Sequence, residues 1–293
     1  MTNSSSDKVF NIVNYLLLAI VTLLVLYPLY FVLSASVSDP LYVLRGEMWL
    51  LPKDINFDAY KKVFMNEDIL NGFWNTIKYT AVGTAINVVM TTMAAFPLSR
   101  KDFMGRNLIM GFLVFTMFFS GGLIPSYLLI KELGMLDTFW VMVIPNAVAI
   151  WNIIIMRTFF QTTIPIELQE SAMIDGCSNI QILIKIVLPL SMPVIAVMVL
   201  FYAVGHWNSY FNALIYLQDR ELFPLQLILR EILIQSQTDE MVKATSESFV
   251  KQQLSVEGLK YAVLVVSNIP MMLLYPFLQR YFVKGFMIGA IKG

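Results

Sequence analysis

Six apolar runs, each about 20 residues long, constrain this chain more than any other feature. A helix of that length crosses roughly 30 Å of hydrocarbon. Only 14% of the 293 residues are charged and 58% are hydrophobic, whereas a soluble domain is roughly one quarter charged. We therefore expect an all-α, polytopic membrane protein with six transmembrane helices. The six expected spans are Ile12–Leu33, Thr76–Leu98, Asn107–Leu129, Thr138–Phe159, Pro189–Leu214 and Tyr261–Val283.

The lysines and arginines predict the orientation of these spans. Six spans place both termini on one side, which then carries nine positive and five acidic residues. The other side carries eleven positive and fifteen acidic residues, mostly within two long loops. Positive residues in short loops favour the cytoplasm, so we expect both termini to be cytoplasmic. The net charge is zero and no basic stripe is visible, which argues against a nucleic-acid partner.

The expected organisation follows from the spans and their orientation. Small residues after the first run, at 34–36, resemble a signal-peptide cleavage site. The run has 22 residues, which is longer than the apolar core of a signal peptide, and its flank carries only one positive residue, Lys8. We therefore expect that the segment is retained as the first span. The predicted order is a cytoplasmic N-terminus (1–11), the first span (12–33), an extracytoplasmic loop (34–75), a transmembrane core (76–283) and a cytoplasmic tail (284–293). The core includes a cytoplasmic loop at about 164–188 and an extracytoplasmic loop at 215–260.

The cytoplasmic loop contains the sequence ESAMIDGCSNIQILIKIVLP, from Glu170 to Pro189. Pro165 suits the first turn of a helix, and Gly176 readily adopts the left-handed conformation that ends one. Ser178, followed three residues later by Gln181, is the pattern of a capping box at the start of a second helix. We therefore expect a short helix with apolar and acidic residues, a glycine turn and a second short helix. Such a helix is suited to a groove of a partner protein.

This loop closely resembles the "EAA" loop of ATP-binding-cassette importer permeases, E-A-A-x2-D-G-A-x8-I-x-L-P. The resemblance implies a non-catalytic permease whose loop is a coupling helix, seated in a cleft of a separate ATP-binding subunit. It implies an anchoring contact for Glu170, loop stabilisation for Asp175 and the turn for Gly176. Ser171 and Cys177 replace two alanines of the motif. The alternative is a surface helix at the membrane interface without a partner. The matching positions are Glu170, Ala172, Asp175, Gly176, Ile186, Leu188 and Pro189.

Further runs resemble carbohydrate-importer permeases of the maltose type, in the branch labelled as aldouronate or complex-polysaccharide permeases. These runs are YPLYFVLSASVSDP, GGLIPSYLLIKELGMLDTFW, HWNSYFNALIYL and GFMIGAIKG. The resemblance implies a second, related permease chain, a dimer of ATP-binding subunits, and a solute-binding protein or lipoprotein at the outer loops. It implies an oligosaccharide as substrate. The chain has no G-x-x-x-x-G-K-[ST] phosphate loop, so ATP and Mg²⁺ are expected on the partner ATPase, with no cofactor on this chain.

Amides and aromatic rings within two spans are the candidate substrate path. Amides hydrogen-bond sugar hydroxyls, and aromatic rings pack against the apolar faces of sugars. Asn208 and Asn212 are four residues apart and are expected to share a helix face. The alternatives are asparagines that tie helices together and aromatic rings that anchor the membrane interface. The candidates are Asn146, Trp151 and Asn152 in the fourth span and Trp207, Asn208, Tyr210 and Asn212 in the fifth.

The spans lack deeply placed charges, which weighs against an ion-coupled secondary carrier. They also show no clustered acids, metal ligands or nucleophile–base pair, so we expect neither a metal site nor a membrane enzyme such as a glycosyltransferase. The only histidine, His206, is either packed and hydrogen-bonded or a proton relay. The only cysteine, Cys177, excludes an intrachain disulfide. An importer for a non-sugar solute would share the same loop and is the alternative function. If the substrate is a sugar, the sequence allows either an acidic or a neutral one.

Overall fold

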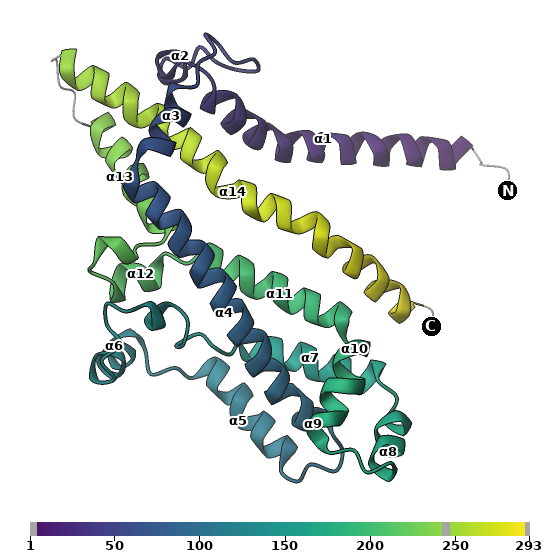
Figure 1. Ribbon diagram of the computed structural model, residues 1–293. Coiled ribbons are helices and arrows are strands. Elements are labelled where there is room, and N and C mark those ends of the chain that lie inside the picture. The colour runs from purple at the N-terminus through teal and green to yellow at the C-terminus, as the bar shows by residue number, and fades with distance from the viewer. Residues whose placement is uncertain (1–4, 242–246, 291–293) are drawn as a thin grey trace. The chain divides into compact units, whose positions relative to one another are not determined.

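The computed structural model describes residues 5–241 and 247–290, and every regular element in them is helical, as expected (Figure 1). Three short elements depart from α-geometry: η1 (Phe139–Met142) and η3 (Arg220–Leu222) are 3₁₀ helices and η2 (Leu183–Val187) is a π-helix. The α-helices are α1 (Ser5–Ser36), α2 (Pro40–Leu44), α3 (Asp58–Met65), α4 (Glu67–Ser99), α5 (Arg106–Phe118), α6 (Leu123–Glu132), α7 (Ile150–Thr163), α8 (Ile166–Ile174), α9 (Asn179–Ile182), α10 (Leu188–Leu190), α11 (Met192–Trp207), α12 (Phe211–Tyr216), α13 (Leu225–Met241) and α14 (Glu247–Ala290).

The chain divides into two compact units, and the first consists of Met1–Leu70 and Leu229–Ile269. In this unit the end of α1 packs against α14, where the rings of Phe31 and Tyr261 meet edge-on with centroids 6.2 Å apart. The hydroxyls of Ser36 and Tyr60 share a hydrogen bond of 2.7 Å, which joins α1 to α3. The apolar stretch of α1 has no buried share.

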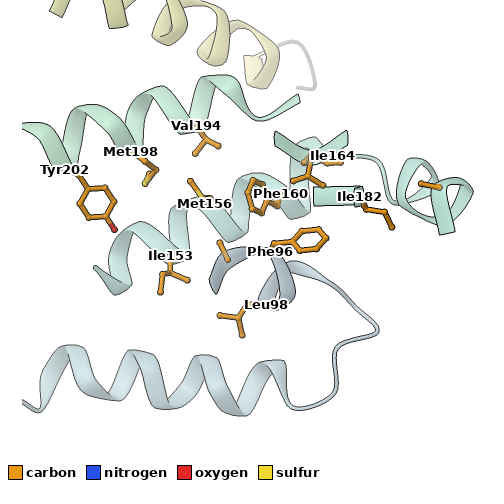
Figure 2. Close-up of a cluster of buried hydrophobic side chains, with 13 residues drawn as sticks. Phe96, Leu98, Ile153, Met156, Phe160, Ile164, Ile182, Val194, Met198 and Tyr202 are labelled. Atoms are coloured by element: carbon orange, nitrogen blue, oxygen red, sulfur yellow. The ribbon is translucent and has the colours of Figure 1, made fainter. Parts of the chain in front are cut away.

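The second unit, Asn71–Ile228 with Pro270–Gly293, contains two apolar clusters. One cluster joins the end of α4 to α7 and α11 and includes Phe96, Met156 and Met198 (Figure 2). The other joins Tyr79 of α4 to η1 and α12. The two clusters pack different levels of α4, which is therefore the central helix of this unit.

Three helices are long and apolar enough to span a membrane: Lys8–Ser36 within α1, α4 itself, and Val256–Leu274 within α14. They overlap the first, second and sixth expected spans, the last of these with a shift towards the N-terminus. Two further spans are formed only if bent pairs of helices are counted, α5 with α6 and α9–α10 with α11. The described residues thus give three to five candidate spans by length and composition, compared with the six continuous helices that were expected.

The third and fourth expected spans are not continuous helices. Residues 107–129 form α5 and α6, which meet at an angle of 111°, because Gly121 and Gly122 interrupt the helix and Gly122 has a φ of 86°. Residues 138–159 form η1, an irregular segment and the first part of α7. Pro145 lies in the irregular segment and lacks the N–H that a continuous helix requires. The prediction of one helix over 138–159 was therefore wrong.

The fifth expected span is also broken at both ends. Pro189 lies in the short α10, and the long helix α11 begins only at Met192 after a bend of 84°. At its other end, α11 stops at Trp207 with Asn208 as the C-cap. The Asn208 side chain donates to the Val204 carbonyl at 2.9 Å, a local bond of the kind that competes with helix continuation. Asn208 and Asn212 therefore lie in different segments and do not share a helix face, contrary to expectation.

Candidate functional site

The 164–188 loop folds as a helix, a glycine turn and a second helix, as the sequence predicted. Its first helix, α8, begins directly after Pro165, which is the N-cap residue and not the first helical residue. Gly176 has a φ of 79°, the left-handed conformation in which a β-carbon is strained. The Gly176 N–H donates to the Met173 carbonyl at 3.0 Å and the Cys177 N–H to the Ala172 carbonyl at 2.9 Å. These two bonds form a Schellman motif that ends α8.

The second helix of the loop, α9, begins with the expected capping box. The Ser178 N–H donates to Oε1 of Gln181 at 2.8 Å, and the Gln181 N–H donates to Oγ of Ser178 at 3.4 Å. Two donors that a helix start leaves unpaired are thereby satisfied. The path of the chain through this loop is consequently fixed by bonds between residues at most five apart.

Few side chains hold this loop against the rest of the unit. Ala172 of α8, Ile182 of α9 and Val187 of η2 are buried in the cluster shown in Figure 2, and Cys177 packs at its edge. The opposite faces of the loop are open, and Ile174 is 87% exposed. Among the predicted coupling residues, Ala172 is thus an anchor to the core. The other four, which are exposed, are Glu170, Ser171, Asp175 and Gly176.

An arginine that the sequence analysis did not single out links this loop to the end of α4. The Arg100 guanidinium donates to Oδ1 of Asn179 at 3.1 Å and to the sulfur of Met173 at 3.3 Å. It also forms a two-pronged ion pair with Asp102, at 2.9 and 2.6 Å. The hydrogen bonds from Arg100 lower the pKa of the Asp102 carboxyl below its usual range. The feature of the sequence that could have indicated Arg100 is the charge pair Arg100–Asp102, which directly follows an apolar span.

A cavity of about 810 Å³ lies beside the same loop, lined by the end of α4, the start of α5, the end of α7 and α8. Three positive side chains line it, those of Lys101, Arg106 and Arg157, together with Arg100 in its ion pair. Glu167 and Glu170 of α8 contribute carboxylates. The loop therefore borders a charged hollow.

The candidate substrate-path residues separate into two groups by exposure. Asn152 and Trp207 are buried, 7% and 3% exposed, and the Trp207 ring packs edge-on against Phe73 with centroids 5.9 Å apart. Asn212 is half-buried. The exposed candidates are Asn146, Trp151, Asn208 and Tyr210.

A polar stripe along α4 was missed by the sequence analysis. His206 of α11 shares a hydrogen bond of 2.6 Å with Oδ1 of Asn87, whose amide donates to the Asn146 carbonyl at 2.6 Å. His206 is thus buried and hydrogen-bonded, one of the two possibilities left open for it. The hydroxyls of Thr91 and Tyr202 lie 2.6 Å apart, and the Tyr202 hydroxyl accepts from the Ala149 N–H at 3.2 Å. The stripe could have been recognised from its helical spacing of three and four residues: Thr76, Thr80, Thr84, Asn87 and Thr91.

Comparisons with known proteins agree on one class of protein. The model of the family described as "Binding-protein-dependent transport system inner membrane component" matches residues 1–288. Protein LplC of Bacillus subtilis is 41% identical over 100% of this chain and 98% of its own length. The polygalacturonan/rhamnogalacturonan transport system permease protein YtcP of Bacillus subtilis is 40% identical over 98% of this chain and 99% of its own.

A solved structure is similar over nearly the same extent. It is the crystal structure of a bacterial ABC transporter involved in the import of the acidic polysaccharide alginate. The similarity has a TM-score of 0.86 and 35% identity, covering 96% of this chain and 99% of the other. Both the sequence and the fold are therefore similar from end to end.

Proposed function

Because the chain belongs to the binding-protein-dependent transport system inner membrane component family, we propose that it is the permease subunit of an ATP-driven oligosaccharide importer. It moves its substrate inward by alternating access and is itself non-catalytic. The 164–188 loop couples it to a separate ATPase. The observation that carries this proposal is the geometry of the loop. Its turn is fixed by local hydrogen bonds, and one side of α8, which includes Glu170 and Ile174, is exposed.

The coupling contact is proposed to form on the exposed side of α8. Glu170 is exposed and has no ion pair within the described residues. An exposed carboxylate next to a bare apolar side chain, Ile174, offers both orientation and buried area to a groove. Asp175 and Gly176 maintain the turn that fixes the direction of α8. ATP and Mg²⁺ bind to the partner subunit, and this chain holds no cofactor.

Movement of the loop is proposed to reach the spans through the cluster in Figure 2. Ala172, Ile182 and Val187 share that cluster with residues of α4, α7 and α11. Packed interiors transmit displacement because they have few voids. The bend of 84° before α11 provides a place where α11 changes its angle while the cluster stays packed. Closure of the ATPase dimer would therefore displace α7 and α11 together.

The substrate path is proposed to run past the irregular segment before α7. Non-helical backbone at membrane depth is tolerated only where it is buried in protein or lines a water-filled cavity. Residues 144–146 are exposed, which favours the second case. Asn146, Trp151, Asn208 and Tyr210 then supply amides and rings to a sugar. Asn152, Trp207 and the half-buried Asn212 support them from behind.

The remaining parts of the importer are proposed from the family and the charge pattern. Both termini and the 164–188 loop face the cytoplasm, while residues 34–75 and 215–260 receive a solute-binding protein or lipoprotein. A second, related permease chain and a dimer of ATP-binding subunits complete the assembly. Acidic oligosaccharides are the first substrates to test, because one relative is named for polygalacturonan transport and the similar solved structure belongs to an importer of alginate.

The experiment that tests this function is purification of the tagged chain from its native membrane followed by reconstitution in vesicles. An ATPase, a second permease and a solute-binding protein should accompany it, in a ratio of this chain to ATPase of about 1:2. Uptake of an oligogalacturonide should require ATP, and a neutral maltooligosaccharide should be the substrate control. Uptake driven by an ion gradient without ATP would contradict the proposal.

A further inference from the structure

The charged cavity beside α8 is the feature of the molecule that the proposed function leaves unused. It has a volume of about 810 Å³ and lies at the ends of α4, α5 and α7. Two arginines and a lysine line it from three segments: Lys101 from the α4–α5 connection, Arg106 from α5 and Arg157 from α7. Positive charges that converge from separate segments on one hollow attract an anion.

Arg106 and Arg157 each use only one of their side-chain hydrogen-bond donors in the bonds that the structure shows. Nε of Arg157 donates to the Leu98 carbonyl at 2.8 Å, and one terminal nitrogen of Arg106 donates to the Arg100 carbonyl at 2.9 Å. A guanidinium has five N–H donors, so these single bonds hold each group in place and leave its other donors available. Within the part of the chain that the structure describes, neither arginine has an ion pair.

The acidic residues of the cavity do not cancel this charge. Asp102 is already paired with Arg100, so that pair is neutral. Glu167 and Glu170 are exposed on α8, and the proposed function directs Glu170 towards the ATPase. The inference rests on that proposal at this point: with Glu170 engaged elsewhere, three cations face the single carboxylate of Glu167.

The position and the neighbourhood of the cavity indicate the kind of anion. Lys101 lies between α4 and α5, Arg106 is the first residue of α5 and Arg157 lies in α7. The junction of α4 and α5 is expected at the level of the bilayer phosphates when these spans are inserted. Guanidinium groups bind phosphate through paired, charge-assisted hydrogen bonds, and basic pockets between spans bind anionic headgroups. A second hollow of about 480 Å³, lined mainly by apolar side chains including Phe96 and Leu183, shares Arg100 with the first.

We propose that the cavity formed by Lys101, Arg106 and Arg157 binds a phosphate-bearing anion, with the headgroup of an anionic phospholipid as its source. The phosphate accepts hydrogen bonds from the spare guanidinium donors and from the Lys101 ammonium. A bound phosphate diester carries one negative charge, so it offsets part of the charge of the three cations beside α8 and joins the α4–α5 connection to α5 and α7. The proposal makes the coupling loop sensitive to the lipid composition of the membrane.

The test measures binding of short-chain lipids to the full chain, purified with its partners in a neutral detergent. The probes are dioctanoyl phosphatidylglycerol, dioctanoyl phosphatidylcholine and inorganic phosphate. The variants are Lys101→Gln and Arg157→Gln, separately and together. Lys101 is exposed and has no hydrogen bond within the described residues, so Lys101→Gln should fold even if an arginine variant does not. Lys185→Gln is the matched control, because Lys185 is an exposed cation of the same loop outside the cavity.

Phosphatidylglycerol should bind the wild type, and each variant should weaken it about tenfold, the effect of losing one charge-assisted contact. Phosphatidylcholine should not bind, and Lys185→Gln should not change the affinity. Binding of inorganic phosphate with the same sensitivity to the variants would support the cavity and identify a soluble anion as its source. Equal binding of phosphatidylglycerol to the wild type and the double variant would overturn the proposal.

The same preparations separate this inference from the proposed function. If no ATPase accompanies the chain but phosphatidylglycerol still binds with the expected sensitivity, the cavity is retained and the coupling function fails. If the double variant loses the ATPase while its lipid binding is unchanged, the cations form a contact with the partner and the lipid site is refuted.

Discussion

The 164–188 loop, proposed to couple the chain to an ATPase, and the proposed substrate path lie in the same unit but are stabilised by different kinds of interaction. The Schellman motif and capping box of the loop use hydrogen bonds between residues at most five apart, at Gly176 and Ser178. The path segment before α7 is held by bonds from residues more than fifty positions away, Asn87 and Tyr202. A locally fixed loop keeps its shape while it moves as a unit. A segment held at long range changes when the helices around it move, as an alternating-access path requires.

The largest effect on transport is expected from Gly176→Val. A β-carbon at a φ of 79° costs about 1 kcal/mol or more, and valine further opposes the turn, so α8 should point in a different direction. We expect transport to be abolished while the chain still inserts in the membrane. Uptake in vesicles and membrane fractionation measure the two properties. Gly111→Ala is the control, because Gly111 lies in α5 with open space around its Cβ position. Normal uptake by Gly176→Val would refute the proposed turn.

A tryptophan pair tests the division of the path residues by exposure. Trp207→Ala should destabilise the protein by about 3–5 kcal/mol, because it leaves a cavity in a packed interior. Trp151 is 61% exposed, so Trp151→Ala should leave the unfolding temperature nearly unchanged and raise the substrate concentration needed for half-maximal uptake. Thermal unfolding and uptake kinetics distinguish them. The same loss of stability in both variants would remove Trp151 from the proposed path.

The long-range bonds of the path are tested at Asn87. Asn87→Ala leaves His206 and the Asn146 carbonyl without their partner, and an unsatisfied buried polar group costs about 1–3 kcal/mol. We expect a lower unfolding temperature and reduced transport with normal binding of the ATPase. Asn107→Ala, an exposed asparagine at the start of α5, should show neither effect. An Asn87→Ala variant with wild-type stability would contradict the role given to this network.

The smallest effect is expected at Asp102, beside the loop. Its pKa is lowered in the folded state by hydrogen bonds from Arg100, so the ion pair stabilises the protein above the ordinary aspartate pKa of about 3.9. That contribution is lost as the pH falls through the lower, folded-state pKa. The Asp102 side chain is 65% exposed, so solvent screening limits the contribution to a few tenths of a kcal/mol. Thermal unfolding measured from pH 6 downward should show this dependence in the wild type and not in Asp102→Asn. The same pH dependence of the unfolding temperature in the wild type and in Asp102→Asn would show that the Arg100–Asp102 pair does not stabilise the protein.

The two regions also differ in how much of them the sequence predicts. Gly176, Ser178 and Gln181 act on their own neighbours, so their spacing alone predicted the turn and the capping box. The breaks near Pro145 and after Trp207 occur inside apolar runs of spanning length, where hydropathy alone predicts a continuous helix. A proline such as Pro145 indicates a weak point in a helix, but the path of the chain around it depends on distant partners.

Partners distant in the sequence are the general reason for what was missed. Asn87 and Thr91 are polar residues in an apolar run, and only their contacts with α11 and the segment before α7 reveal their role. Arg100 counts towards the orientation of the spans, yet its bonds to Asn179 and Met173 join segments about 75 residues apart. Side-chain exposure was equally hidden, since nothing in the sequence distinguishes the buried Trp207 from the exposed Trp151.

The most direct test of the central claim is site-specific photocrosslinking from α8 in native membranes. A photoreactive residue at Ile174, which is 87% exposed, should form an adduct with an ATP-binding subunit, identified by mass spectrometry. The same group at Trp49, 73% exposed in the 34–75 loop, should not capture that subunit. Adducts of Ile174 with lipid alone, or capture of the ATPase equally from both positions, would contradict the claim that α8 is the coupling helix.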